Sequence, residues 1–157
     1  MVEVQVDLRH TLVVGWNVAQ AHELVSDVPR SAGHFPGLER LDDLGDSVYR
    51  WNMKTFQVSK FRHQVSYAAR YVSDPDQRTV VWTTVGSDNN TVADGQWRVV
   101  PEGTGARLEF ENRLTVRLPV PRLAGRVVKG LVPRITEKET RTYLERIAAT
   151  MDGRLVR

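Results

Sequence analysis

The chain has 157 residues and no cysteine, which excludes a disulfide framework, a cysteine-based metal site and a thiol nucleophile. Hydrophobic residues make up 41% and charged residues 26%, as in an ordinary globular protein, so we expect one domain over residues 1–157. The first residues, MVEVQVDLRH, lack the apolar run of a signal peptide, and no window reaches the ~18 apolar residues of a membrane span. We therefore expect a cytoplasmic protein, either free or peripheral to the membrane.

The net charge of +3 is unevenly distributed along the chain. Residues 117–157 hold ten basic and four acidic side chains, a net charge of +6, whereas residues 1–116 have a net charge of −3. Much of the excess lies in the segment RLAGRVVKGLVPR at positions 122–134. Any role that depends on positive charge is therefore expected in the C-terminal part.

The N-terminal part predicts a strand followed by two short helices. VEVQVDL at positions 2–8 alternates apolar and polar residues, the pattern of a half-buried strand with Val2, Val4, Val6 and Leu8 facing inward. Asn17 is expected to cap a helix over NVAQAHELVSD. A second helical turn is expected over PRSAGHF, before the break at 36–37.

Residues 38–118 predict six antiparallel strands. Five groups of turn-forming residues divide this region at intervals of roughly a dozen residues. These groups are LGDS at 44–47, SK at 59–60, SDPD at 73–76, GSDN at 86–89 and PEGTG at 101–105. The clearest strand is ARLEFENRLTVR at 106–117, with one apolar face and one charged face. The apolar face needs a cover.

A C-terminal helix is expected to supply that cover. Its apolar stripe at helical spacing consists of Leu144, Ile147, Ala148, Met151 and Leu155. Upstream, Pro133 is expected to kink the helix, because proline removes one backbone hydrogen bond and clashes with the preceding turn. The alternative is a new helix that begins at Thr136, since TEKE at 136–139 fits a capping box.

This order of elements resembles the START-like, or SRPBCC, superfamily, whose members have the helix-grip fold. The resemblance is carried by SDVPRSAGHFPGLERL at 26–41, by PEGTGARLEFE at 101–111 and by the closing helix. The chain is most similar to the bacterial branch that holds polyketide cyclases, coenzyme Q-binding proteins and a carbon monoxide dehydrogenase component. The resemblance implies an α+β fold with a curved antiparallel sheet wrapped around a long C-terminal helix. It also implies a cavity that, in relatives, accepts lipids, polyketides, quinones or other apolar molecules.

The strand alternation predicts which side chains would line such a cavity. The inward set is Tyr49, Trp51, Met53, His63, Val65, Tyr67, Tyr71, Trp97, Val99, Phe110, Asn112 and Leu114. From it we expect a ligand-binding group of Trp51, Tyr67, Trp97, Phe110 and Asn112 on the sheet, with Leu144, Ile147 and Met151 on the helix. The alternative is that the aromatic residues simply fill a core and that Asn112 bonds to a neighbouring group.

The sequence favours a binding protein over an enzyme. Neither paired acids, nor a nucleophile beside a base, nor a metal-ligand cluster is evident, so no catalytic residue, metal or cofactor is expected. The leading hypothesis is binding or transport of a hydrophobic small molecule or lipid. The alternatives are a polyketide aromatase/cyclase-like enzyme, which would use polar inward groups such as His63 or Tyr67, and a protein–protein interaction module.

The basic segment at 122–134 has two interpretations. Wound as a helix, Arg122, Arg126 and Lys129 lie on one side, as on any solvated helix face. The second interpretation is transient docking on an anionic membrane, with residues 121–133 as a mobile lid over the cavity. Nucleic acid is not an expected partner, because no aromatic residue in the segment could stack on bases.

Overall fold

The computed structural model describes residues 1–58 and 60–157, so the expected turn at 59–60 lies partly outside the described residues. Eight antiparallel strands form one curved sheet in the order β10-β1-β9-β8-β7-β6-β3-β2, and β4 and β5 form a separate hairpin. The strands are β1 (Val2–Val14), β2 (Leu38–Gly45), β3 (Val48–Met53), β4 (Phe56–Val58), β5 (Phe61–His63), β6 (Ser66–Asp74), β7 (Thr79–Thr84), β8 (Thr91–Glu102), β9 (Gly105–Leu118) and β10 (Gly153–Leu155). The helices are α1 (Val18–Ser26), α2 (Val28–Ala32), the 3-10 turn η1 (Arg122–Ala124) and α3 (Gly125–Thr150). This arrangement confirms the expected helix-grip fold.

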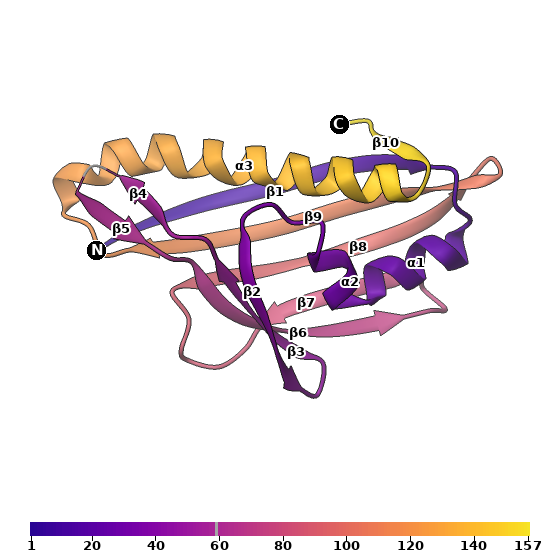
Figure 1. The fold of residues 1–157 in the computed structure, drawn as a ribbon, viewed down its shortest axis with the longest axis horizontal. Helices are drawn as coiled ribbons and strands as arrows, with labels where there is room; N and C mark the ends of the chain where they lie inside the picture. The colour runs from indigo at the N-terminus through magenta and orange to yellow at the C-terminus, as the bar shows by residue number, and fades with distance from the viewer. Residues whose placement is uncertain (59) are drawn as a thin grey trace.

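The long helix α3 extends along the sheet and covers its concave face (Figure 1). The β4–β5 hairpin and the N terminus lie at the end where α3 begins, and the C terminus lies near the last turns of α3 (Figure 1). None of the described helices is long and apolar enough to cross a membrane.

The first strand is longer than expected, because it continues to Val14. Val2, Val4, Val6 and Leu8 are buried as expected. The alternation is interrupted in the sequence by His10, a polar residue at a buried position. The structure accommodates it because Nδ1 donates to the carbonyl of Arg157 at 2.7 Å and Nε2 lies 2.9 Å from the carboxylate of Glu137.

The two short helices begin at side-chain caps. The side chain of Asn17 accepts a hydrogen bond from the Gln20 backbone at 2.9 Å, and the Gln20 side chain accepts one from the Asn17 backbone at 3.3 Å. This reciprocal capping box satisfies two backbone N–H groups at the start of α1. Asp27 caps α2 in turn, by accepting from the Arg30 backbone at 3.2 Å.

Three expectations for the later elements need correction. Leu155 does not belong to the helical stripe, because α3 ends at Thr150 and Leu155 lies in β10, which pairs with β1. Eight strands, not six, lie between α2 and α3, because the stretch around residues 56–63 forms the additional β4–β5 hairpin. The fresh helix start at Thr136 is wrong, since α3 runs through Pro133 without a break. The hydroxyl of Thr136 does not cap a helix but donates to the carbonyl of Val132 at 2.8 Å, one turn earlier.

Candidate functional site

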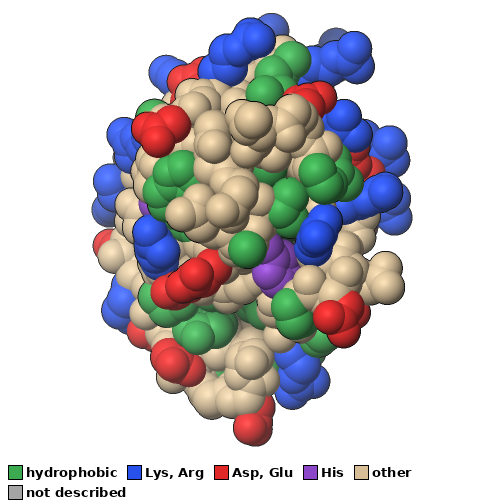
Figure 2. All heavy atoms as spheres, turned by 90° about the vertical axis from the view of Figure 1, so that its right-hand side faces the viewer, with side chains coloured by type: hydrophobic (Ala, Val, Ile, Leu, Met, Phe, Trp, Pro, Cys, Tyr) green, Lys and Arg blue, Asp and Glu red, His purple; other side chains and the backbone are tan. Residues whose placement is uncertain are grey.

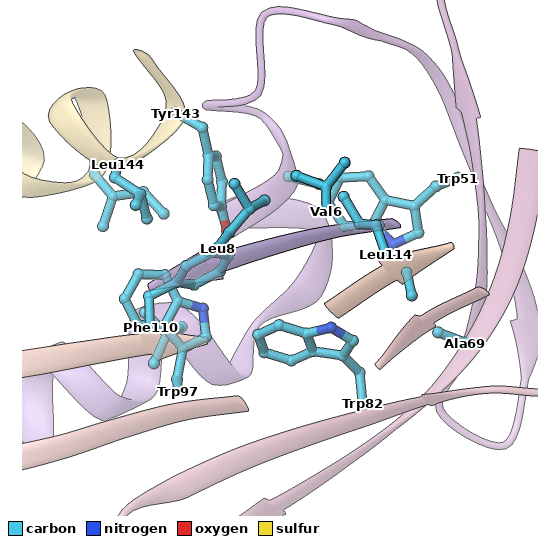
Figure 3. Close-up of a cluster of buried hydrophobic side chains, with 14 of the residues drawn as sticks. Val6, Leu8, Trp51, Ala69, Trp82, Trp97, Phe110, Leu114, Tyr143 and Leu144 are labelled. Atoms are coloured by element: carbon cyan, nitrogen blue, oxygen red, sulfur yellow. The ribbon is translucent and has the colours of Figure 1, made fainter. Parts of the chain in front are cut away.

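A cavity of about 190 Å³ lies between the concave face of the sheet and α3. Its walls are mainly aromatic. The sheet contributes Trp51, Tyr67, Tyr71, Trp82, Trp97 and Phe110. Figure 3 shows Trp51 and Trp82 on one side of this interior region, and Tyr143 pointing from α3 toward Phe110 and Trp97 on the other. Lys54 and Thr55 are the exposed residues of the lining and mark the side on which the cavity reaches solvent.

The sheet places five expected ligand-site residues together. Trp51, Tyr67, Trp97, Phe110 and Asn112 all line the cavity. Trp51 and Tyr67 stack with their ring centroids 6.4 Å apart, and Trp97 meets Phe110 edge to face at 4.9 Å. Neighbouring strands carry these residues at matching positions, since Trp51 pairs with Tyr67 and Trp97 with Phe110 in the sheet register. Whether they bind a ligand is taken up below.

The expected placement of Leu144, Ile147 and Met151 at the cavity wall is wrong. All three are fully buried, but they pack in the solid core and do not line the cavity. The reason lies in the length of α3, whose inner face covers two different regions. Its earlier turns lie over the cavity, with Thr136, Glu139, Thr140 and Tyr143 in the lining, and its later turns lie over the core.

His63 and Tyr49 also differ from their expected positions at the cavity. His63 lies in the β4–β5 hairpin, where its ring meets Phe56 edge to face at 5.6 Å. Its pKa is lowered because burial disfavours the charged imidazolium, and Nε2 has no hydrogen-bond partner among the described residues. Tyr49 packs against Tyr71 at 6.0 Å, outside the cavity lining. Neither residue is therefore placed to act on a molecule inside the cavity.

The sequence reasoning missed Trp82, which connects two parts of the cavity wall. Trp82 is buried on β7, and its indole Nε1 donates to Oδ1 of Asn112 at 3.0 Å. Asn112 is therefore partly satisfied by a neighbour, as the alternative interpretation allowed, and still lines the cavity. On the same side of the cavity, the indole Nε1 of Trp51 donates to the hydroxyl of Tyr71 at 2.9 Å. The alternation of TVVWTT at 79–84 could have placed Trp82 on the inner face beside Val80.

Tyr143 and Glu139 were also missed, because the search on α3 followed an apolar stripe. Thr136, Glu139, Thr140 and Tyr143 follow helical spacing and extend the buried face toward the N-terminal half of α3. The hydroxyls of Tyr143 and Ser31 lie 2.6 Å apart and form a hydrogen bond. Burial raises the pKa of Tyr143 to about 12. The phenol is therefore neutral at physiological pH.

Glu139 is the one carboxylate in the cavity lining. It is half-buried, and burial raises its pKa above the ordinary value of 4.5, although the nearby charge of Lys54 acts in the opposite direction. No hydrogen bond or ion pair engages the carboxylate among the residues that the structure describes. The end of the Glu139 side chain lies close to Gly37.

Replacing Glu139 with glutamine is expected to stabilise the protein at neutral pH. The folded protein holds the Glu139 proton more tightly than the unfolded chain, so stability falls as pH rises from about 4.5 toward the raised pKa. Glutamine is uncharged at every pH, so the variant does not lose stability in this way as the pH rises. Thermal unfolding measured across pH should show a higher Tm for Glu139→Gln at neutral pH and no difference at about pH 4. A difference that does not change with pH would contradict a buried ionised carboxylate.

Comparison with known proteins shows the fold. No protein-family model and no curated protein sequence matches the chain. An aromatase/cyclase from Streptomyces is similar with a TM-score of 0.66 at 14% identity, over 94% of this chain and 93% of that one. A protein of Thermus thermophilus gives 0.62 at 15% identity over 95% and 96%. Norcoclaurine synthase from Thalictrum flavum gives 0.60 at 19% identity over 96% and 95%. The sheet, the covering helix and these neighbours together show that the chain has the helix-grip fold.

Proposed function

We propose that the cavity between the sheet and α3 binds a hydrophobic small molecule and that the protein acts as its carrier. The observation that supports this most is the cavity itself, which is about 190 Å³ in volume and walled by aromatic rings. Because the cavity reaches solvent, contact between water and its apolar walls costs free energy. An apolar ligand would recover part of that free energy. The volume of about 190 Å³ is below the roughly 300 Å³ of a pocket for a drug-sized ligand, so we expect a small ligand of about one or two rings.

Fold likeness supports the same class of ligand. One norcoclaurine synthase structure, with a TM-score of 0.59 and 20% identity, was solved in complex with dopamine and hydroxybenzaldehyde, which are both single-ring aromatic molecules. The Streptomyces neighbour is an aromatase/cyclase. At this level of identity the likeness supports a small-molecule ligand for this chain but does not identify it.

Retention of a ligand tests the carrier proposal. The purified protein would be incubated with an apolar extract of cells, separated from unbound material and examined by native mass spectrometry. We expect a discrete adduct that is lost on denaturation. A bare protein mass after incubation would refute the carrier role.

The alternative function is a cyclase-like enzyme. It is favoured by the presence of a phenol, Tyr67, and a carboxylate, Glu139, in the lining of one cavity. An enzyme would lose turnover in Tyr67→Phe while the variant still binds substrate, whereas a carrier has no turnover to lose. A protein-interaction module, the third hypothesis, would depend on the outer surface and would be indifferent to changes inside the cavity.

We further propose that the start of α3 docks on an anionic membrane from which the cargo is drawn. Arg122, Arg126 and Lys129 are exposed, as expected for a basic surface. Leu123 is 97% exposed and Val127 is 58% exposed. No acidic residue occurs from position 117 to position 136. The opposite end of the molecule differs, because acidic and basic side chains are mixed there (Figure 2). Exposed apolar side chains within a basic surface suit the interface of an anionic bilayer.

Vesicle binding is expected to depend on these three basic residues. Each basic residue near an anionic surface contributes about 1 kcal/mol, so replacing Arg122, Arg126 and Lys129 with glutamine should weaken binding about a hundredfold at low salt. Sedimentation with phosphatidylglycerol vesicles measures this. Replacement of Arg9, Arg70 and Arg98, which are exposed elsewhere on the sheet, is the matched control. An equal loss of vesicle binding in both triple variants, or no binding by the wild type at low salt, would contradict the docking proposal. Residues 122–134 would then be an ordinary solvated helix face.

The first part of α3 is expected to open more readily than the later part. Gly125, Gly130 and Pro133 all weaken a helix, whereas Leu144 and Ile147 anchor the later turns in the core. Hydrogen exchange should therefore be faster across residues 121–133 than across 140–151. Equal protection of the two segments would argue for a rigid helix and an entrance elsewhere.

A further inference from the structure

Tyr67 carries a hydroxyl without a hydrogen-bond partner among the described residues. The side chain lies on β6, is only 6% exposed and lines the cavity. Among the described residues, none forms a hydrogen bond with this hydroxyl. The hydroxyl is therefore free to donate a hydrogen bond to a polar atom of a molecule in the cavity.

Two further cavity residues have their acceptor atoms occupied by tryptophan. An indole N–H can only donate, so the bond from Trp82 fixes Oδ1 of Asn112 and leaves the Nδ2 amide group to donate elsewhere. The bond from Trp51 likewise uses the hydroxyl oxygen of Tyr71 as an acceptor and leaves its proton available. No partner for Nδ2 of Asn112 is present among the described residues.

These donors belong to one continuous group of side chains. Tyr67 stacks on Trp51, whose indole bonds to Tyr71, and Tyr71 lies 5.9 Å from the ring of Trp82. Trp82 then bonds to Asn112. Burial raises the pKa of both Tyr67 and Tyr71, and each phenol therefore keeps its proton at neutral pH. Among the described residues of the sheet wall, these three side chains thus offer free donors to the cavity, and none of the three is ionised.

We propose that Tyr67, Tyr71 and Asn112 form a subsite for a carbonyl oxygen, and that the ligand is a ring-containing molecule with a ketone. This inference rests on the proposed function, because it assumes that the cavity binds an apolar molecule. A hydrocarbon chain alone would leave all three donors without acceptors. A neutral carbonyl oxygen can accept from two of the three donors at once, while the rings of the ligand contact the aromatic walls.

Two probes with the same bicyclic skeleton test the subsite. Tetralin is a hydrocarbon, and tetralone adds one ketone oxygen to it. By isothermal titration calorimetry, the wild type should bind tetralone about tenfold more tightly than tetralin. Tyr67→Phe should weaken tetralone binding about five- to tenfold and leave tetralin binding unchanged, as expected for loss of one hydrogen bond. Tyr49→Phe is the matched control, since Tyr49 lies outside the lining, and it should change neither.

A second variant addresses the amide donor. Asn112→Asp keeps an oxygen that can accept from Trp82 but replaces the donating group with an acceptor, so it should weaken tetralone binding more than tetralin binding. Thermal unfolding confirms that each variant is folded, and Tyr67→Phe should keep the wild-type Tm because its hydroxyl bonds to no described residue. Equal affinity for the two probes, or an unchanged ratio in both variants, would overturn the carbonyl subsite and leave the carrier proposal standing. If neither probe binds, the apolar-ligand proposal fails as well.

Discussion

Replacing Thr136 with tryptophan is expected to abolish ligand binding and leave the protein folded. Thr136 is half-buried on α3 and lines the cavity, so a large indole at this position would occupy space that a ligand needs. Because the cavity measures only about 190 Å³, room for a second ring system would be lost. We expect the affinity for tetralin to fall at least about a hundredfold, because the apolar surface of one or two ligand rings would no longer be buried. Calorimetric titration measures the affinity.

The chain offers a closely matched control for this variant. Thr142 lies on the same helix and its hydroxyl donates to the Lys138 carbonyl at 3.1 Å, just as Thr136 donates to Val132 at 2.8 Å. Thr142 does not line the cavity. Thr142→Trp should therefore lose the same kind of hydrogen bond and still bind the probe. Wild-type affinity in Thr136→Trp would show that the ligand binds somewhere else.

Truncating Leu144 to alanine is expected to cost about 2–5 kcal/mol of unfolding free energy. Leu144 is fully buried in the core beneath the later turns of α3, and the truncation leaves a hole that the surrounding side chains cannot fill completely. Leu123→Ala is the control, because Leu123 is 97% exposed and should cost about 0.5 kcal/mol or less. Urea denaturation followed by circular dichroism gives both values. A loss below about 1 kcal/mol for Leu144→Ala would contradict close packing of this part of the helix on the sheet.

Much of the fold could be predicted because its local signals agree with one another. Alternation identified β1 and β9, Asn17 marked the start of α1, and turn residues separated most of the strands. The β4–β5 hairpin escaped detection because three-residue strands are too short to show alternation. The end of β1 was misjudged because His10 interrupts the apolar pattern, and its partners, Glu137 and Arg157, are remote in sequence.

The cavity wall could be predicted less well than the fold. Alternation placed Trp51, Tyr67, Trp97, Phe110 and Asn112 correctly, because neighbouring strands hold them in register. On α3 the apolar stripe identified residues of the solid core and not of the cavity wall, because hydrophobic spacing identifies the residues that pack most tightly. A cavity needs less complete packing, and its helical wall is formed by polar and aromatic side chains. Only the tertiary structure distinguishes where the solid core ends and the cavity begins.

The exposed basic segment illustrates a different limit. The sequence located its charge, but it could not separate a solvated helix face from a docking surface. That distinction depends on whether the apolar residues between the charges are covered. Val128 and Val132 are buried against the sheet, whereas Leu123 and Val127 are not.

The central claim is that an apolar molecule occupies the space between the sheet and α3, and the four tryptophan indoles test it directly. Trp51, Trp82 and Trp97 line the cavity, whereas Trp16 does not and lies with its ring 5.9 Å from the guanidinium of Arg30. Each indole N–H gives its own signal in a proton–nitrogen correlation spectrum, so Trp16 is an internal control. On titration with tetralin, we expect the signals of the three cavity indoles to shift and that of Trp16 to stay in place. Shifts confined to Trp16, or no shift at saturating probe, would contradict the claim.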